Sequence, residues 1–142
     1  MEYKDRFEKE ILTRTLNIWD NYSGPFEETL FLNLCVGLLI IPKESLYNQL
    51  PTEEVSISNW DIDPSWITFE KNNDKTVKTT IRHIRNAIAH NGIAFVGLNA
   101  VIACVEIEDK DISRQTSFTM RLDISNFKDF VLKVARLALT FL

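Results

Sequence analysis

The sequence predicts a mainly α, α+β fold: a bundle of four to five helices with a β-hairpin before the C-terminal helix. Apolar residues recur at helical spacing over most of the chain, and two runs between residues 100 and 122 alternate instead with period two. Only four Gly and four Pro occur among 142 residues, so long ordered elements are expected. A chain of this length fits a single domain, over residues 1–142.

Two helices are expected in the first part of the chain, and a short third one can follow them. Over Tyr3–Trp19, charged residues separate an apolar stripe at helical spacing, formed by Phe7, Ile11, Leu12, Thr15, Ile18 and Trp19. A second helix begins after the breaker Asn21–Pro25 and runs to about Ile41. It is almost entirely apolar, which predicts a central core helix. Pro42 ends it, and Lys43–Leu50 can add a short helix.

The segment Pro51–Lys75 has no clear periodicity and is expected to form a long loop. It contains Trp60 and Trp66 between four acidic residues, Glu53, Glu54, Asp61 and Asp63. One interpretation is an irregular segment held in place by the two tryptophans. The other is a functional loop, because structureless loops of this length are uncommon. The spacing of the carboxylates matches no metal-binding loop, so we expect them to be solvated.

The second half of the chain predicts a helix, a hairpin and a last helix. The helix covers Thr76–His90, with Val77, Ile81, Ile84 and Ile88 toward the core and Asn91–Gly92 as its C-cap. The hairpin pairs Ala100–Ile107 with Thr116–Leu122, and Glu108–Arg114 connects them, with a turn at Asp109, Lys110 and Asp111. Ser125 is expected to cap the last helix. Its apolar stripe is Phe127, Phe130, Val131, Val134, Leu137, Ala138 and Phe141.

Composition narrows the class of function. The net charge of −4 argues against strong nonspecific nucleic-acid binding, although it allows a local basic site. Cys35 and Cys104 lie in apolar runs and are expected to be buried in a reducing compartment. No Cys/His spacing suggests a zinc site, and no cofactor is expected. The N-terminus lacks the apolar core of a signal peptide, and the run Leu34–Ile41 is too short to span a bilayer, so a cytoplasmic protein is expected.

The chemistry most clearly encoded in the chain lies near the end of the Thr76–His90 helix. Arg85, Asn86 and His90 combine a cation for phosphate, a hydrogen-bonding amide and a group that moves protons near neutral pH. On a helical wheel, His90 and His83 project almost opposite to the apolar arc, with Arg82 and Asn86 beside His90. Arg82 and His83 are therefore candidates for binding phosphate.

Two copies of this helix face would make a better site than one. A single helix face is convex, whereas reactive sites are usually concave. A two-fold axis would bring two arginines and two histidines into one cleft, and the small Ala87 or Ala89 would permit close approach. Such a cleft suits metal-free cleavage of RNA, in which the 2′-hydroxyl attacks the phosphate, imidazoles transfer protons and arginine stabilises charge.

The segment Arg85–His90 resembles the signature of the HEPN superfamily: arginine, a polar residue, three further residues, then histidine. The second helix and the hairpin are similar to a stand-alone subgroup found on plasmids and in defence-rich regions. The resemblance implies a dimeric helical domain in which Arg85 and His90 are the catalytic pair and Asn86 the polar residue between them. It implies a metal-independent endoribonuclease, acting on RNA as a toxin or phage-defence effector, with a cognate antitoxin as a partner class.

Other interpretations stay open at this point. His90 could serve only as a helix cap interacting with the helix dipole, and Arg85 could only cover apolar surface with its stem. For Arg82 and His83, a solvated face is the plainer interpretation. A non-catalytic HEPN-like module that binds nucleotide, RNA or protein is the alternative to the nuclease.

Overall fold

The computed structural model describes residues 7–40, 47–69, 74–98, 101–111 and 113–142. The chain divides into two compact units: Met1–Leu50 with Val131–Leu142, and Pro51–Phe130. Helix α6 (Ile124–Leu139) begins in the second unit and ends in the first. The predicted helix over Lys43–Leu50 lies largely outside the described residues. The single domain over residues 1–142 stays a prediction.

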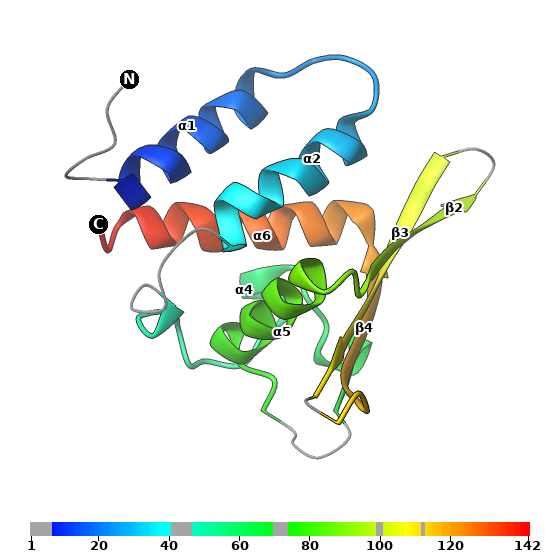
Figure 1. The fold of residues 1–142 in the computed structure, drawn as a ribbon. Helices are drawn as coiled ribbons and strands as arrows, with labels where there is room; N and C mark the ends of the chain where they lie inside the picture. The colour runs from blue at the N-terminus through cyan, green and yellow to red at the C-terminus, as the bar shows by residue number, and fades with distance from the viewer. Residues whose placement is uncertain (1–6, 41–46, 70–73, 99–100, 112) are drawn as a thin grey trace. The chain divides into compact units, whose positions relative to one another are not determined.

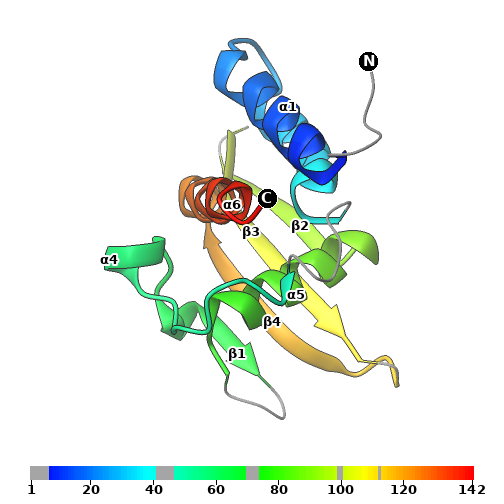
Figure 2. The same cartoon turned by 90° about the vertical axis from the view of Figure 1, so that its left-hand side faces the viewer.

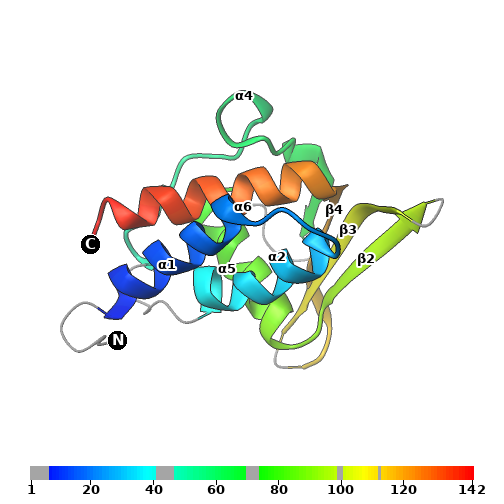
Figure 3. The same ribbon diagram turned by 90° about the horizontal axis from the view of Figure 1, so that it is seen from above.

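The first unit contains two antiparallel helices that lie side by side (Figure 1; Figure 3). They are α1 (Phe7–Asn21) and α2 (Glu27–Cys35), and the π-helical turn η1 (Val36–Ile40) continues α2. The ring of Trp19 meets the buried ring of Phe31 edge to face, with centroids 4.9 Å apart. Part of the predicted stripe of α1 is solvent-accessible, whereas Leu12, Thr15 and Leu16 are buried.

Gly37 explains how η1 approaches α1. A Cβ on Gly37 would lie 2.8 Å from Oγ1 of Thr15, closer than real Cβ contacts, so only glycine fits without a shift. The predicted second helix is α-helical only to Cys35 and continues as the π-helical turn η1. Cys35 is buried, as expected, and burial raises the pKa of its thiol to about 12.

The segment predicted as a long loop contains three short elements, which corrects that expectation. They are α4 (Ile57–Trp60), the 3₁₀ turn η2 (Pro64–Trp66) and the strand β1 (Ile67–Phe69). Trp60 is buried and meets Phe130 edge to face at 6.3 Å, so one tryptophan does hold the segment in place. Ser56 caps α4 and Asp63 caps η2, and these local hydrogen bonds replace a periodic signal.

The second unit is built on a four-stranded antiparallel sheet, where the sequence predicts two strands. Its order among the described residues is β1-β4-β3-β2, with β2 (Ile93–Leu98), β3 (Val101–Lys110) and β4 (Thr116–Asp123). The fold is thus mixed α+β. β3 continues through Asp109 and Lys110, so the predicted turn at these two residues is wrong.

The two faces of the sheet differ in polarity, as the predicted alternation requires. The inward face carries the buried side chains of Ile67, Val105, Ile107, Phe118, Met120 and Leu122. Helix α5 (Val77–Ala89) lies across one face of the sheet (Figure 2) and contacts β3. The opposite face carries exposed polar side chains and the half-buried Cys104, which was expected to be buried.

The last helix follows β4 without a loop. α6 begins at Ile124, so Ser125 lies within the helix and does not cap it. Most of its predicted apolar stripe is confirmed by the burial of Phe127, Phe130, Val131, Val134 and Ala138. Leu137 is half-buried, and Phe141 lies beyond the end of α6 and is exposed, so the stripe is shorter than predicted. None of the described helices has the length and apolarity needed to cross a membrane.

Candidate functional site

Helix α5 carries the candidate motif and has well-defined ends. The Thr76 hydroxyl accepts a hydrogen bond from the Thr79 N–H at 3.2 Å, which is an N-cap. At the other end His90 is the C-cap, and Asn91 follows in the left-handed conformation with φ 59°. The N–H of Gly92 then donates to the carbonyl of Ala87 at 2.6 Å. The predicted Asn91–Gly92 stop is confirmed.

Gly92 attaches the end of α5 to the sheet. Its carbonyl accepts a hydrogen bond from the N–H of Glu108 on β3 at 2.7 Å. A Cβ at position 92 would collide with the carbonyl oxygen of Glu108, so glycine is required for this approach. The end of α5, where His90 lies, is therefore held beside the end of β3.

The burial of the side chains on α5 agrees only in part with the helical wheel. Ile81 and Ile84 are fully buried, and His90 is exposed, as the sequence predicts. Arg85 and Asn86 are half-buried, which places them between core and solvent. Arg82 is exposed, so it lies at the surface together with His90.

His83 is the exception, because it faces the sheet and not solvent. Its side chain is 19% exposed, and its ring stacks on Phe118 with centroids 4.6 Å apart and planes inclined by 6°. Phe69 meets the same ring at 5.5 Å. The wheel considers only one buried arc, whereas the sheet covers a second side of α5. The predicted solvated position of His83 is therefore wrong.

Asp109 is the functional candidate that the sequence reasoning missed. Its Oδ2 accepts from Nδ1 of His83 at 2.7 Å and lies 3.4 Å from Nδ2 of Asn86. The residue is 6% exposed. A signal was present: Val105 and Ile107 point inward, and strand alternation places Asp109 on the same side. The alternation was not followed as far as Asp109 because the sequence predicts a turn there, among other acidic residues.

A cleft of about 650 Å³ opens beside His90 within the second unit. It combines cations and carboxylates from the end of α5, the end of β3 and the following turn: His90, Asn91, Gly92, Glu108, Asp109, Lys110, Asp111 and Arg114. Of the predicted site residues, His90 lines this cleft, whereas the lining does not include Arg82, His83, Arg85 or Asn86. Lys110 and Arg114 are cations that the motif alone did not identify.

The turn at the edge of this cleft is ordered by one carboxylate. Oδ1 of Asp111 accepts from the N–H of Ser113 at 2.9 Å and from the N–H of Gln115 at 3.1 Å. Arg114 lies between them with φ 64°, a conformation that the hydrogen-bonded turn supports. Nζ of Lys110 lies 3.4 Å from a carboxylate oxygen of Glu108. Lys110, Asp111 and Arg114 thus place charged side chains at this edge of the cleft.

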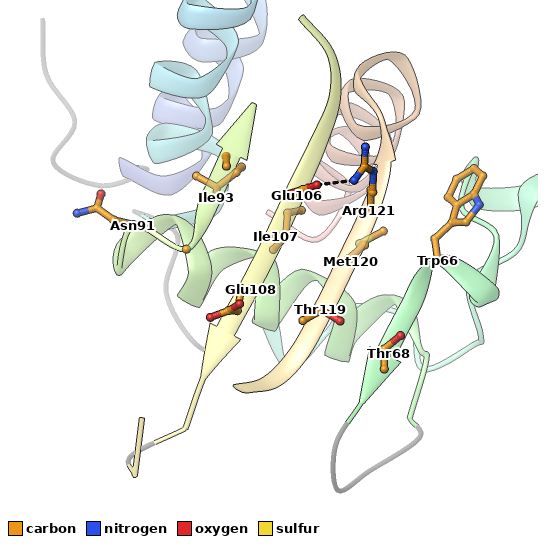
Figure 4. A pocket seen from close by; sticks show the side chains of 12 residues that line it. Trp66, Thr68, Asn91, Ile93, Glu106, Ile107, Glu108, Thr119, Met120 and Arg121 are labelled. Carbon is orange, nitrogen blue, oxygen red and sulfur yellow. Dashed lines mark hydrogen bonds and ion pairs between the residues drawn. The ribbon is translucent and has the colours of Figure 1, made fainter. Parts of the chain in front are cut away.

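A second cavity, of about 490 Å³, lies on the polar face of the sheet (Figure 4). Trp66 stands at one edge of it, and Arg121 forms an ion pair with Glu106 at 2.6 Å across β3 and β4. Asn91, Gly92 and Glu108 line both cavities.

The acidic residues of the middle segment do not gather into a metal site. Glu53 and Glu54 are exposed, and Asp63 is engaged in capping η2. Across the ranges that the structure describes, no three His, Cys, Asp or Glu side chains are arranged to hold a metal ion. The side chains that line the cleft beside His90 carry imidazole, amide, carboxylate, ammonium and guanidinium groups.

Comparison with known proteins supplies the family. No curated protein and no solved structure matches the chain. One family model matches residues 1–141, and it is described as HEPN pEK499 p136. The match covers almost the whole length, including α5 with its Arg85–His90 motif. The chain belongs to the HEPN pEK499 p136 family, within the HEPN superfamily.

Proposed function

We propose that this protein is a metal-independent endoribonuclease in which Arg85, Asn86 and His90 act on the scissile phosphate. The observation that carries the proposal is the position of His90, exposed at the rim of a polar cleft on a helix end that is bonded to β3. Membership of the HEPN superfamily supports it. Catalysis benefits from groups held on rigid elements, and the Gly92–Glu108 bond provides such support.

In the proposed reaction the 2′-oxygen of RNA bonds to phosphorus while the bond from phosphorus to O5′ breaks. One imidazole takes the 2′-hydroxyl proton, and another protonates the leaving O5′. The products are a 2′,3′-cyclic phosphate and a 5′-hydroxyl. Arg85 would stabilise charge on the phosphorane, because its planar fork matches phosphate oxygens. Arg82, which is exposed, stays a proposed phosphate-binding residue. His83 was predicted together with it, but the ring of His83 is bound to Asp109 against the sheet.

The second imidazole would come from a second copy of the chain. The sequence holds two histidines, and His83 is bound to Asp109 against the sheet. Each subunit thus offers one exposed imidazole, at His90. A two-fold axis near the His90 cleft would bring two imidazoles and two Arg85 side chains to one phosphate. We therefore propose a homodimer with a composite site.

The biological setting is proposed from the family resemblance. A cytoplasmic toxin or phage-defence effector that cleaves RNA would fit a HEPN domain of this size. A cognate antitoxin protein is the partner class that such a toxin would need. The genes adjacent to this one would identify such a partner directly.

The test is cleavage of mixed RNA in excess EDTA by the purified wild-type protein and by His90→Ala and Arg85→Ala. Wild-type cleavage in EDTA with loss of activity in both variants is expected. Arg136→Ala is the matched control, since Arg136 is an exposed arginine of the first unit that pairs with Asp20. It should cleave at the wild-type rate. Cleavage that EDTA abolishes, or that survives both motif substitutions, would refute the nuclease.

The second candidate function is a non-catalytic module that binds nucleotide or RNA. The cavity beside Trp66 on the sheet favours it, because an aromatic ring and an ion pair there suit a base. Binding of labelled oligonucleotides that Trp66→Ala weakens, by a wild-type protein that cleaves no RNA, would support this function. A protein-binding module would show neither property.

A further inference from the structure

Asp109 stands out in the part of the chain that the structure describes. Among the buried residues that the structure describes, Asp109 is the one with a carboxylate, ammonium, guanidinium or imidazole side chain. A buried carboxylate is costly unless it is paired and hydrogen-bonded. Its two partners, His83 and Asn86, both lie on α5, and Asn86 belongs to the motif. An acid in this position needs an explanation that packing alone does not provide.

We infer that Asp109 is a positioning residue that sets the orientation of the Asn86 amide, with His83 holding the carboxylate in place. This inference rests on the proposed function, because it assigns a role to Asn86 in that reaction. An ionised carboxylate only accepts hydrogen bonds, so the group of Asn86 that faces it must be the nitrogen. The planar amide then directs its carbonyl oxygen away from Asp109.

His83 fixes the carboxylate more firmly than Asn86 does. The distance of 2.7 Å from Nδ1 to Oδ2 lies in the range of charge-assisted hydrogen bonds, in which an Nδ1–H group donates to a carboxylate. The imidazole is held in turn by Phe118, stacked at 4.6 Å, and by Phe69 at 5.5 Å. The 3.4 Å from Nδ2 of Asn86 to the same oxygen is longer, so the hydrogen bond to Asn86 is the weaker of the two.

The backbone keeps these groups in register. His83 and Asn86 are three residues apart on α5, so they share a side of the helix. Asp109 adjoins Glu108, whose N–H bonds the carbonyl of Gly92 at 2.7 Å. Helix and strand are thereby linked next to the network. Asn86 would then serve as an acceptor, ordering an N–H or O–H group at the reaction centre, and not as a donor to phosphate.

The kinetic test compares Asp109→Asn, Asn86→Ala and the double variant under single-turnover conditions. The rate constant should fall by roughly 10- to 100-fold in each single variant, with the RNA dissociation constant within about twofold of wild type, since small displacements of reacting groups cost that much. The double variant should be no slower than Asn86→Ala, because Asp109 acts through Asn86. Multiplying effects, or an unchanged rate in Asp109→Asn, would overturn the inference.

Two controls separate positioning from folding. Asp123→Asn removes an exposed carboxylate from the neighbouring strand β4 and should leave the rate unchanged. Asp109→Glu keeps the charge and should recover part of the rate lost in Asp109→Asn. If Asp109→Asn does not fold, Asp109→Glu is compared with wild type directly, and a rate equal to wild type would count against positioning.

A readout that needs no cleavage distinguishes this inference from the nuclease itself. The side-chain amide of Asn86 gives its own pair of NMR signals, and their shifts and order should change in Asp109→Asn while Asp123→Asn leaves them as in wild type. If the wild type cleaves no RNA, the proposed function fails and this measurement alone decides the positioning. Unchanged Asn86 signals in Asp109→Asn would reject it.

Discussion

The two histidines of this chain allow one matched pair of substitutions, His83→Ala and His90→Ala. The first removes a half-buried ring that is stacked on Phe118 and hydrogen-bonded to Asp109. The second removes an exposed ring at a helix cap. The same chemical change is therefore made on one helix in two environments, and the structure predicts different results for stability.

The cost of His83→Ala follows from its contacts. Loss of a hydrogen bond to a charged group costs about 1.5–3 kcal/mol, and each aromatic contact adds roughly 0.5–1.5 kcal/mol. His83→Ala removes two ring contacts and leaves the Asp109 carboxylate with Asn86 as its remaining side-chain partner on α5. We therefore expect the free energy of unfolding to fall by about 3 kcal/mol, which lowers Tm by roughly 10 °C. For His90→Ala we expect less than about 0.5 kcal/mol, as for ordinary surface changes.

The assay is urea unfolding followed by circular dichroism, with each variant compared with wild type at one pH and protein concentration. A common concentration is needed because dimerisation raises apparent stability. Equal destabilisation by the two substitutions would refute the assignment of His83 to the sheet. A double-mutant cycle between His83→Ala and Asp109→Ala should show a coupling of at least about 1 kcal/mol, and additivity would mean that the two residues do not interact.

Three further predictions address the backbone, pH and assembly. Gly92→Ala should destabilise the protein by about 1–3 kcal/mol, because its Cβ collides with Glu108, and calorimetry should show no loss if that approach is absent. Hydrogen bonds from the Ser65 backbone and side chain lower the pKa of Asp63. The stabilising effect of the ionised Asp63 is therefore complete above the ordinary aspartate pKa of about 3.9, and it is lost as pH falls through the lower pKa of the folded state. The unfolding free energy of Asp63→Asn should therefore differ from that of wild type at neutral pH and converge with it in acid. Light scattering should find a dimer at micromolar concentration, and a strict monomer would contradict the composite His90 site.

Much of the motif helix could be predicted from the sequence. The spacing of Ile81 and Ile84 identified the buried side of α5, and Asn91–Gly92 marked its end. These features are local, since one turn of helix and one left-handed residue determine them. The exposure of His90 followed from the same reasoning.

Contacts between distant segments could not be predicted in the same way. His83 and Asp109 are 26 residues apart, and periodicity does not tell which strand lies against which side of a helix. β1 has three residues, too few for an alternating pattern to show in the sequence. It is a strand because it pairs with β4, which is about 50 residues away along the chain. The middle segment therefore looked like a loop.

Each chain presents one exposed imidazole, and this has a genetic consequence if two must meet at a phosphate. Chains without His90 would be dominant-negative, because they would inactivate the intact chains with which they pair. When His90→Ala chains are co-expressed in equal amount with intact chains, random pairing leaves about one quarter of the dimers with both imidazoles. A damaged gene for this protein would then act as an antidote to the intact one.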